Sequence, residues 1–200
     1  LHDALPIFEG QAMVRATDTA RLAEVHFKMQ VQEWKNILLR GYDKDLYERH
    51  LRAFNEEDRQ VNEYLQALAA MAKTTGLSVP ELPSAIANHE RLGREYREAL
   101  KQYRGADPLS ARRVDRSVRG IDREPTEQID AIVAKIKAQA DERMKATETL
   151  AKTQLEAYKS FSAFLLFLVV AGVLFGVFNA WSITRDLPPD VEDDKSEIEE

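Results

Sequence analysis

The sequence contains no cysteine and few glycine or proline residues. Of its 200 residues, 8 are Gly and 7 are Pro. Without Cys, the chain cannot be a disulfide-stapled secreted miniprotein. Because Gly and Pro most often interrupt regular structure, their scarcity favours long helices. The length allows about one or two domains.

Net charge is also small, and it is unevenly placed. The chain has 28 Lys and Arg against 34 Asp and Glu, a formal net charge of −6. Residues 186–200 carry −7, whereas residues 1–185 carry +1. The acidic residues of the tail are Asp186, Asp190, Glu192, Asp193, Asp194, Glu197, Glu199 and Glu200. A nearly neutral body argues against a nucleic-acid partner. The tail also has two prolines and strong like-charge repulsion, so we expect residues 185–200 to be disordered.

Motifs of catalysis and metal binding are missing. There is no glycine-rich phosphate loop and no HExxH, and the four His lie far apart on different segments. A di-iron bundle needs a Glu three residues before a His, and no His of this chain has one. We interpret His89 as a packed or interface histidine rather than a ligand. The sequence therefore predicts no enzyme activity, no metal and no cofactor.

One long segment carries no charge at all. Residues 163–183 (AFLLFLVVAGVLFGVFNAWSI) are 21 residues long and would extend about 31 Å as a helix, which matches the hydrocarbon core of a bilayer. Tyr158 and Trp181 lie near its ends, and Lys159 and Arg185 bracket it, as is typical of membrane interfaces. We predict a transmembrane helix and its junction over residues 161–184. A position near the C-terminus excludes a signal peptide.

The orientation of this span stays open from charge alone. Lys152 and Lys159 precede it, and Arg185 and Lys195 follow it, so the basic residues are balanced. Within the span, Gly172, Gly176 and Ala180 form a small-xxx-small pattern that lets two membrane helices approach closely. Together with the heptad pattern of the preceding region, this favours a homodimer.

Apolar spacing predicts helices over most of residues 8–158. The first segment has a wide apolar face and ends near Gly41, after which Asp43 is a plausible N-cap. That face comprises Leu22, Val25, Phe27, Met29, Val31, Trp34 and Leu38. The second segment has a heptad stripe on one seam. The stripe is Tyr47, Leu51, Phe54, Asp58, Val61, Leu65, Leu68 and Ala72.

Turn signals divide the rest of this region. Gly76, followed by two prolines, ends the second helix, and a third helix runs to about Arg104. The Asp107–Pro108 pair begins the last helix, which Pro125 should kink or restart. We therefore predict an all-α protein: an antiparallel up-down four-helix bundle over residues 8–160 whose last helix continues into the membrane. Residues 1–7 (LHDALPI) fit poorly into it and are interpreted as a non-native or disordered leader.

An arginine-rich stretch begins the last helical region. It comprises Arg112, Arg113, Arg116, Arg119 and Arg123, interleaved with Asp115 and Asp122. Arginine forks bind carboxylates and phosphates bidentately, so the cluster could capture a small organic anion. The favoured interpretation is a solvated face with ion pairs such as Arg112 with Asp115. The sequence leaves both interpretations open.

Two motifs resemble the sensory region of bacterial methyl-accepting chemotaxis proteins. They are residues 30–41 (QVQEWKNILLRG), followed by the 47–54 stretch, and residues 118–129 (VRGIDREPTEQI). The SITR sequence directly after the membrane span is similar to the join to a HAMP linker in that family. The resemblance covers residues 10–187.

The resemblance implies a homodimeric receptor in the bacterial inner membrane, with its bundle in the periplasm and its tail in the cytoplasm. Such a receptor binds a small solute or a periplasmic binding protein and passes a displacement of the last helix across the membrane. Arg40, Arg119 and Arg123 lie in the two motifs and are the candidate ligand-binding residues.

Both ends of the chain depart from the family pattern. The given sequence holds no first membrane helix, as a missing N-terminus would explain, and the acidic tail stands where the family has the Pro-Leu pair and the amphipathic HAMP helix. The alternative is therefore a structural or adaptor membrane protein with an acidic docking tail and no signalling output of its own.

Overall fold

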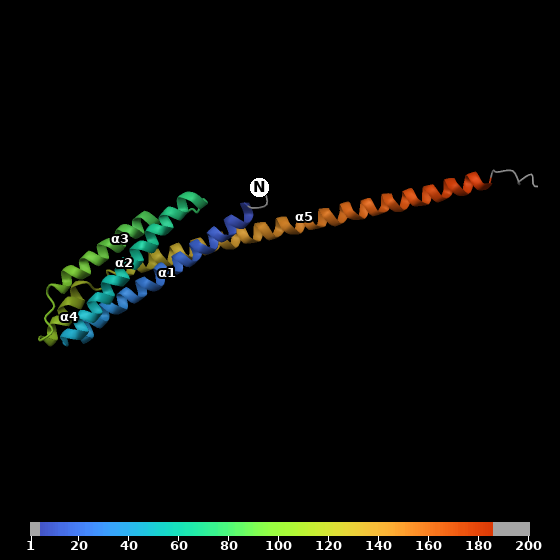
Figure 1. Cartoon of the computed structure of the whole chain (residues 1–200). Coiled ribbons are helices and arrows are strands. Elements are labelled where there is room, and N and C mark those ends of the chain that lie inside the picture. Colours follow the sequence, from blue (N-terminus) through green and yellow to red (C-terminus); the bar gives the residue numbers. More distant parts are fainter. Residues whose placement is uncertain (1–4, 186–200) are drawn as a thin grey trace, which may run out of the picture. The chain divides into compact units, whose positions relative to one another are not determined.

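Residues 5–185 are described by a computed structural model, and they are helical throughout apart from short connections (Figure 1). The helices are α1 (Leu5–Arg40), α2 (Lys44–Thr75), α3 (Leu82–Leu100), α4 (Pro108–Ser117) and α5 (Arg123–Arg185). This part of the chain contains no strand, which confirms the all-α prediction. The chain divides into two compact units, one ending at Thr147 and the other beginning at Glu148. The predicted acidic tail after Arg185 and the first four residues of the predicted leader lie outside the described residues.

Local chemistry sets the two ends of α2 and the start of α4 where the sequence predicts them. The Asp43 side chain accepts a hydrogen bond of 3.0 Å from the backbone N–H of Leu46 and caps α2. Gly76 ends α2 in the left-handed conformation, with φ 65°, which a Cβ would strain. Asp107 caps α4 by accepting from the Leu109 N–H at 2.9 Å, and Pro108 occupies the first helical position.

The predicted last helix is two helices. After α4, Val118 begins a turn in which Gly120 adopts a φ of 82°, and α5 begins at Arg123. Pro125 lies in the first turn of α5, where a backbone N–H has no partner within the helix. The restart predicted at Pro125 is confirmed. The third helix ends at Leu100 rather than near Arg104, because residues 101–107 form successive turns.

The core of the first unit draws on α1, α2, α3, α4 and the first part of α5. In Figure 1, α1, α2 and α3 lie side by side. Trp34 of α1 stacks on Tyr96 of α3 with ring centroids 4.2 Å apart, an arrangement that contributes about 0.5–1.5 kcal/mol beyond burial. Ile132 and Ile136 of α5 are fully buried in the same core. The heptad stripe of α2 faces inward as predicted, and its most buried members are Phe54, Asp58, Val61, Leu65 and Leu68.

A polar network crosses this core. Gln30 of α1 donates from Nε2 to Asp58 Oδ1 at 2.7 Å, and the His89 Nε2–H donates to Gln30 Oε1 at 2.8 Å. Arg97 of α3 donates to Asp58 Oδ2. Burial lowers the pKa of His89 to about 4, outweighing the attraction of Asp58. The structure thus places His89 in the core as a packed histidine.

The second unit consists of the rest of α5. Its apolar stretch has a mean hydropathy of 2.7 over 18 residues and is unburied, so α5 is the one helix among residues 5–185 long and apolar enough to cross a membrane. Gly172 and Gly176 face open space, where an added Cβ would meet no atom within 4 Å. This exposed helix fits the predicted span, and its packing against a second helix stays a prediction.

Candidate functional site

Helix α4 has a buried face and a charged face. Val114 and Ser110 are fully buried, and the Ser110 hydroxyl accepts from the Arg104 N–H at 2.6 Å. Val118, just after the helix, is also buried. These contacts fix α4 beside the end of α3, near the turn between α1 and α2 (Figure 1). The opposite face of α4 is therefore left to solvent.

That face forms an open groove of about 490 Å³, which we call the α4 groove. Four of its six lining residues are arginines. The lining residues are Leu109, Arg112, Arg113, Asp115, Arg116 and Arg119. Spacings of three and four along the helix bring these side chains onto one side. The α4 groove is therefore strongly cationic.

The arginines of the α4 groove differ in their partners. Arg113 Nη2 lies 2.5 Å from Asp107 Oδ2, and this bond holds the pKa of the Asp107 carboxyl below its usual range. Arg119 Nη2 lies 3.7 Å from Asp115 Oδ2, so Asp115 pairs with Arg119. Arg116 Nε donates to the Arg112 carbonyl at 3.4 Å. Among residues 5–185, Arg112 and Arg116 have no carboxylate partner.

The structure brings one of the three predicted ligand residues into the α4 groove. Arg119 lines it, whereas Arg40, at the end of α1, and Arg123, at the start of α5, are exposed outside it. Arg112, Arg113 and Arg116 were part of the arginine-rich stretch but not of the predicted site. Their spacing of three and four residues indicates that they share one face of a helix. Only the packing of α4 decides that this face is exposed to solvent.

Most residues of the first family-like motif have structural roles. Trp34 and Ile37 are core residues, and Gln30 belongs to the buried network. A Cβ on Gly41 would lie 2.4 Å from the Ile37 carbonyl oxygen and 2.9 Å from the Tyr103 hydroxyl. Packing thus explains much of the motif, and Arg40 is one of its exposed residues, with Gln32, Lys35 and Leu39.

The second motif follows the same pattern. Val118, Pro125 and Ile129 are buried, and Gly120 supplies the positive φ of the turn. Arg119 and Arg123 are exposed. Both motifs therefore contribute exposed arginines next to residues that the fold requires.

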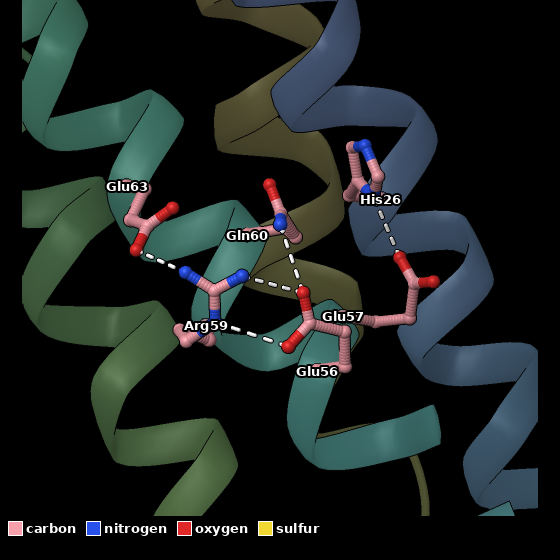
Figure 2. Close-up of polar contacts among 6 residues, drawn as sticks. All are labelled: His26, Glu56, Glu57, Arg59, Gln60 and Glu63. Atoms are coloured by element: carbon pink, nitrogen blue, oxygen red, sulfur yellow. Dashed lines mark hydrogen bonds and ion pairs between the residues drawn. The ribbon is translucent and has the colours of Figure 1, made fainter. Parts of the chain in front are cut away.

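Histidine–carboxylate pairs join α1 and α2. His26 Nδ1 donates to Glu57 Oε2 at 2.6 Å, as Figure 2 shows, and His50 Nδ1 donates to Glu33 Oε2 at the same distance. The two pairs are one heptad apart on each helix, too far apart to act as one site. No group of three or more potential metal ligands occurs in the described part of the chain.

Figure 2 also shows a charged cluster on the surface of α2. Arg59 binds both Glu56 oxygens, at 3.0 Å from Nε and 2.5 Å from Nη2, and also binds Glu63. Gln60 Nε2 donates to Glu56 at 2.9 Å. Arg59 and then Gln60 hold the pKa of Glu56 at about 2. The cluster has one guanidinium group against two carboxylates, and Arg59 is engaged by both of them, so it has less to offer an anionic ligand than the α4 groove has.

Comparisons with known proteins identify one kind of relative. The chain is 29% identical over 177 residues to the methyl-accepting chemotaxis protein CtpH of Pseudomonas aeruginosa, a match that covers 87% of this chain. The chain spans 29% of that relative's length. No family model matches the chain. No solved structure matches it. The resemblance to methyl-accepting chemotaxis proteins is thereby confirmed: most of this chain is a region similar to part of such a protein.

Proposed function

We propose that this chain is the sensory module of a chemoreceptor-like signal transducer. The observation that carries the proposal is α5, one helix that contributes Ile132 and Ile136 to the core of the first unit and contains the apolar stretch of the second. Similarity to a chemotaxis receptor over most of the chain supports it. In the proposed arrangement the apolar stretch spans the bacterial inner membrane, with the helices of the first unit in the periplasm and the tail in the cytoplasm.

The first unit is proposed to be an antiparallel up-down four-helix bundle of α1, α2, α3 and the start of α5. Two pairs support opposite directions for α1 and α2. His26 of α1 pairs with Glu57 of α2. Glu33, seven residues later on α1, pairs with His50, seven residues earlier on α2. Only three residues connect the two helices, as is usual for antiparallel neighbours.

The module is proposed to act as a homodimer. Large apolar side chains of α1 remain exposed on one side of that helix. They are Val14, Leu22, Val25, Met29 and Leu39. Within a helix of 3.6 residues per turn these positions fall in a stripe that a second copy of α1 could cover. The small residues Gly172, Gly176 and Ala180 would extend the contact within the membrane.

Signalling would require two states of α5 that a solute or a binding protein populates differently. Binding near the start of α5 would bias its position, and the helix would carry the displacement through the bilayer. Arg40, Arg119 and Arg123 are proposed to meet the ligand, because they are the exposed arginines of the two family-like motifs.

Cysteine labelling tests the proposed topology, since the chain has no native Cys. Gln66→Cys, on the exposed side of α2, should react with a membrane-impermeant maleimide in intact spheroplasts. Ser196→Cys in the tail should react only after permeabilisation. Labelling of both residues, or of neither, in intact spheroplasts would contradict the proposed orientation.

A hybrid receptor tests the signalling role. The matching region of the Pseudomonas aeruginosa relative is replaced by this chain up to Arg185, and swimming responses to a panel of solutes are recorded. A response that follows this chain rather than the relative's own region supports a sensory module. A hybrid that reaches the membrane yet responds to no member of a broad panel favours the adaptor alternative.

A further inference from the structure

We infer that the α4 groove binds a small organic anion with two or three carboxylates, held by Arg112, Arg116 and Arg119. The inference rests on the proposed sensory function and names the ligand class and the residues that recognise it. It moves the site from the predicted set of Arg40, Arg119 and Arg123 onto the exposed face of α4, with Arg119 common to both.

Unbalanced positive charge is the first argument. The α4 groove contains four guanidinium groups and one carboxylate. Arg113 is held by Asp107, and Asp115 lies nearest to Arg119 at 3.7 Å. Arg112 and Arg116 have no carboxylate within reach among the described residues. The α4 groove therefore offers a cationic surface that attracts anions.

Donor geometry is the second argument. The guanidinium group presents paired N–H donors that match the two oxygens of a carboxylate. In Arg116, only Nε is engaged, by the Arg112 carbonyl at 3.4 Å, so both of its Nη groups remain available as donors. Because Arg112 and Arg116 are four residues apart on one helix, their side chains emerge on the same side. Two carboxylates of one ligand can thus be bound at neighbouring forks.

Size and apolar contact select an organic ligand. The open groove, about 490 Å³, has room for an organic anion. Leu109, on the same wall, is 58% exposed. The methylene groups of a di- or tricarboxylate could cover Leu109 while its carboxylates meet the arginines, whereas a compact inorganic anion would leave this side chain in water.

The base of the α4 groove is fixed before any ligand arrives. Asp107 caps α4, Pro108 begins it, and the buried Val114 and Ser110 anchor its other face. Arg119 lies in the turn that leads to α5, two residues after α4 ends. A ligand that draws Arg119 away from Asp115 would act on this turn, four residues before the start of α5. The α4 groove is thus placed to bias the helix that would signal.

Calorimetric titration of the full chain in lipid nanodiscs tests the assignment, with succinate and citrate as probes. Arg112→Ala and Arg116→Ala should each weaken binding by about tenfold or more, the range for losing a charge-assisted hydrogen bond. Arg112→Lys keeps the charge but loses the fork, so binding should still fall. Arg52→Ala is the matched control, since Arg52 is an exposed arginine of α2 that lies 3.8 Å from Glu48. All these positions are exposed, and circular dichroism verifies that each variant keeps its helix content.

Each remaining outcome contradicts the inference in a different way. Failure of every di- and tricarboxylate tested to bind overturns the α4 groove as a site. Sulfate binding as tight as citrate binding, lost in the same variants, overturns the organic class. Tighter binding of an acidic hexapeptide assigns the surface to a protein partner instead. In all three cases the hybrid receptor still decides the sensory function independently, because it does not depend on the ligand class.

Discussion

Gln139 of α5 and Ser78 of the α2–α3 connection bind each other through two reciprocal hydrogen bonds. The Ser78 backbone N–H donates to Gln139 Oε1, and Gln139 Nε2 donates to the Ser78 carbonyl, both at 3.0 Å. Two further α5 side chains, each four residues from Gln139, bind the same connection. Lys135 binds Glu81 at 2.7 Å, and Arg143 donates to the carbonyls of Thr75 and Gly76 at 3.0 Å each. This ladder fixes the axial position of α5 against the rest of the first unit.

Loss of the Gln139 side chain should loosen the connection locally. A net hydrogen bond contributes about 1 kcal/mol, so Gln139→Ala should make the Ser78 amide exchange with solvent roughly fivefold faster or more. Hydrogen exchange measured by mass spectrometry over residues 75–81 provides the readout. Gln66→Ala, on the exposed side of α2, should leave the rate unchanged. Equal rates in the wild type and Gln139→Ala would mean that the ladder does not hold the loop.

Gly93→Ala should destabilise the first unit. A Cβ at Gly93 would lie 2.5 Å from Asp58 Oδ1 and 2.9 Å from Arg97 Nη1, so the ion pair between Asp58 and Arg97 would have to move. Overpacking of this kind costs about 1–3 kcal/mol. The urea midpoint of unfolding, followed by circular dichroism, measures the loss. Gly10→Ala is the matched control: a Cβ there meets nothing within 4 Å, and the change should raise stability by about 0.5–1 kcal/mol. An unchanged midpoint for Gly93→Ala would refute the close packing.

Stability should fall as the pH drops below about 6.5, because of His89. Its pKa is about 4 in the folded chain against 6.5 for an ordinary His. Between these values the unfolded chain holds a proton that the folded chain does not, so the free energy of unfolding decreases with falling pH, by about 1 kcal/mol per unit. Asp58 and Arg97 are the charged groups that face the ring, and Asp58 opposes this effect while Arg97 adds to it.

Urea unfolding at pH 7, 6 and 5 measures how much His89 contributes to the pH dependence of the free energy of unfolding. His89→Gln removes the titrating group while keeping a polar side chain in the network, so its stability should depend less on pH than that of the wild type. If the free energy of unfolding depends on pH equally in the wild type and His89→Gln, His89 protonates as readily in the folded chain as in the unfolded one.

The exposed stripe of α1 should hold the dimer together. Val25 and Met29 are 49% and 46% exposed in the single chain, and a Glu at either position would place a charge at the centre of the proposed contact. Val25→Glu and Met29→Glu should each shift the chain in nanodiscs or detergent from dimer toward monomer, measured by light scattering. Gln66→Glu, on α2, serves as the charge-matched control. A dimer that persists in both α1 variants would place the contact elsewhere.

The sequence by itself determined both ends of α2, the start of α4 and the class of the fold. Asp43, Gly76 and the Asp107–Pro108 pair act within a few residues of themselves, so their effect could be predicted without a partner segment. The uncharged stretch before Arg185 is likewise a property of consecutive residues. Similarity to a chemotaxis receptor was visible for the same reason, since its two motifs are continuous in the chain.

Tertiary structure alone decided which polar residues pair and which stay available. Gln139 meets Ser78, 61 positions away, and Arg97 meets Asp58, 39 positions away, because separate helices pack there. The same holds for the arginines: burial of Val114 turns Arg112 and Arg116 outward together, and Arg40 and Arg123, on other helices, lie outside the α4 groove. Side-chain partners across helices depend on the register of packing, and apolar periodicity specifies the buried face of a helix but not its axial position against a neighbour.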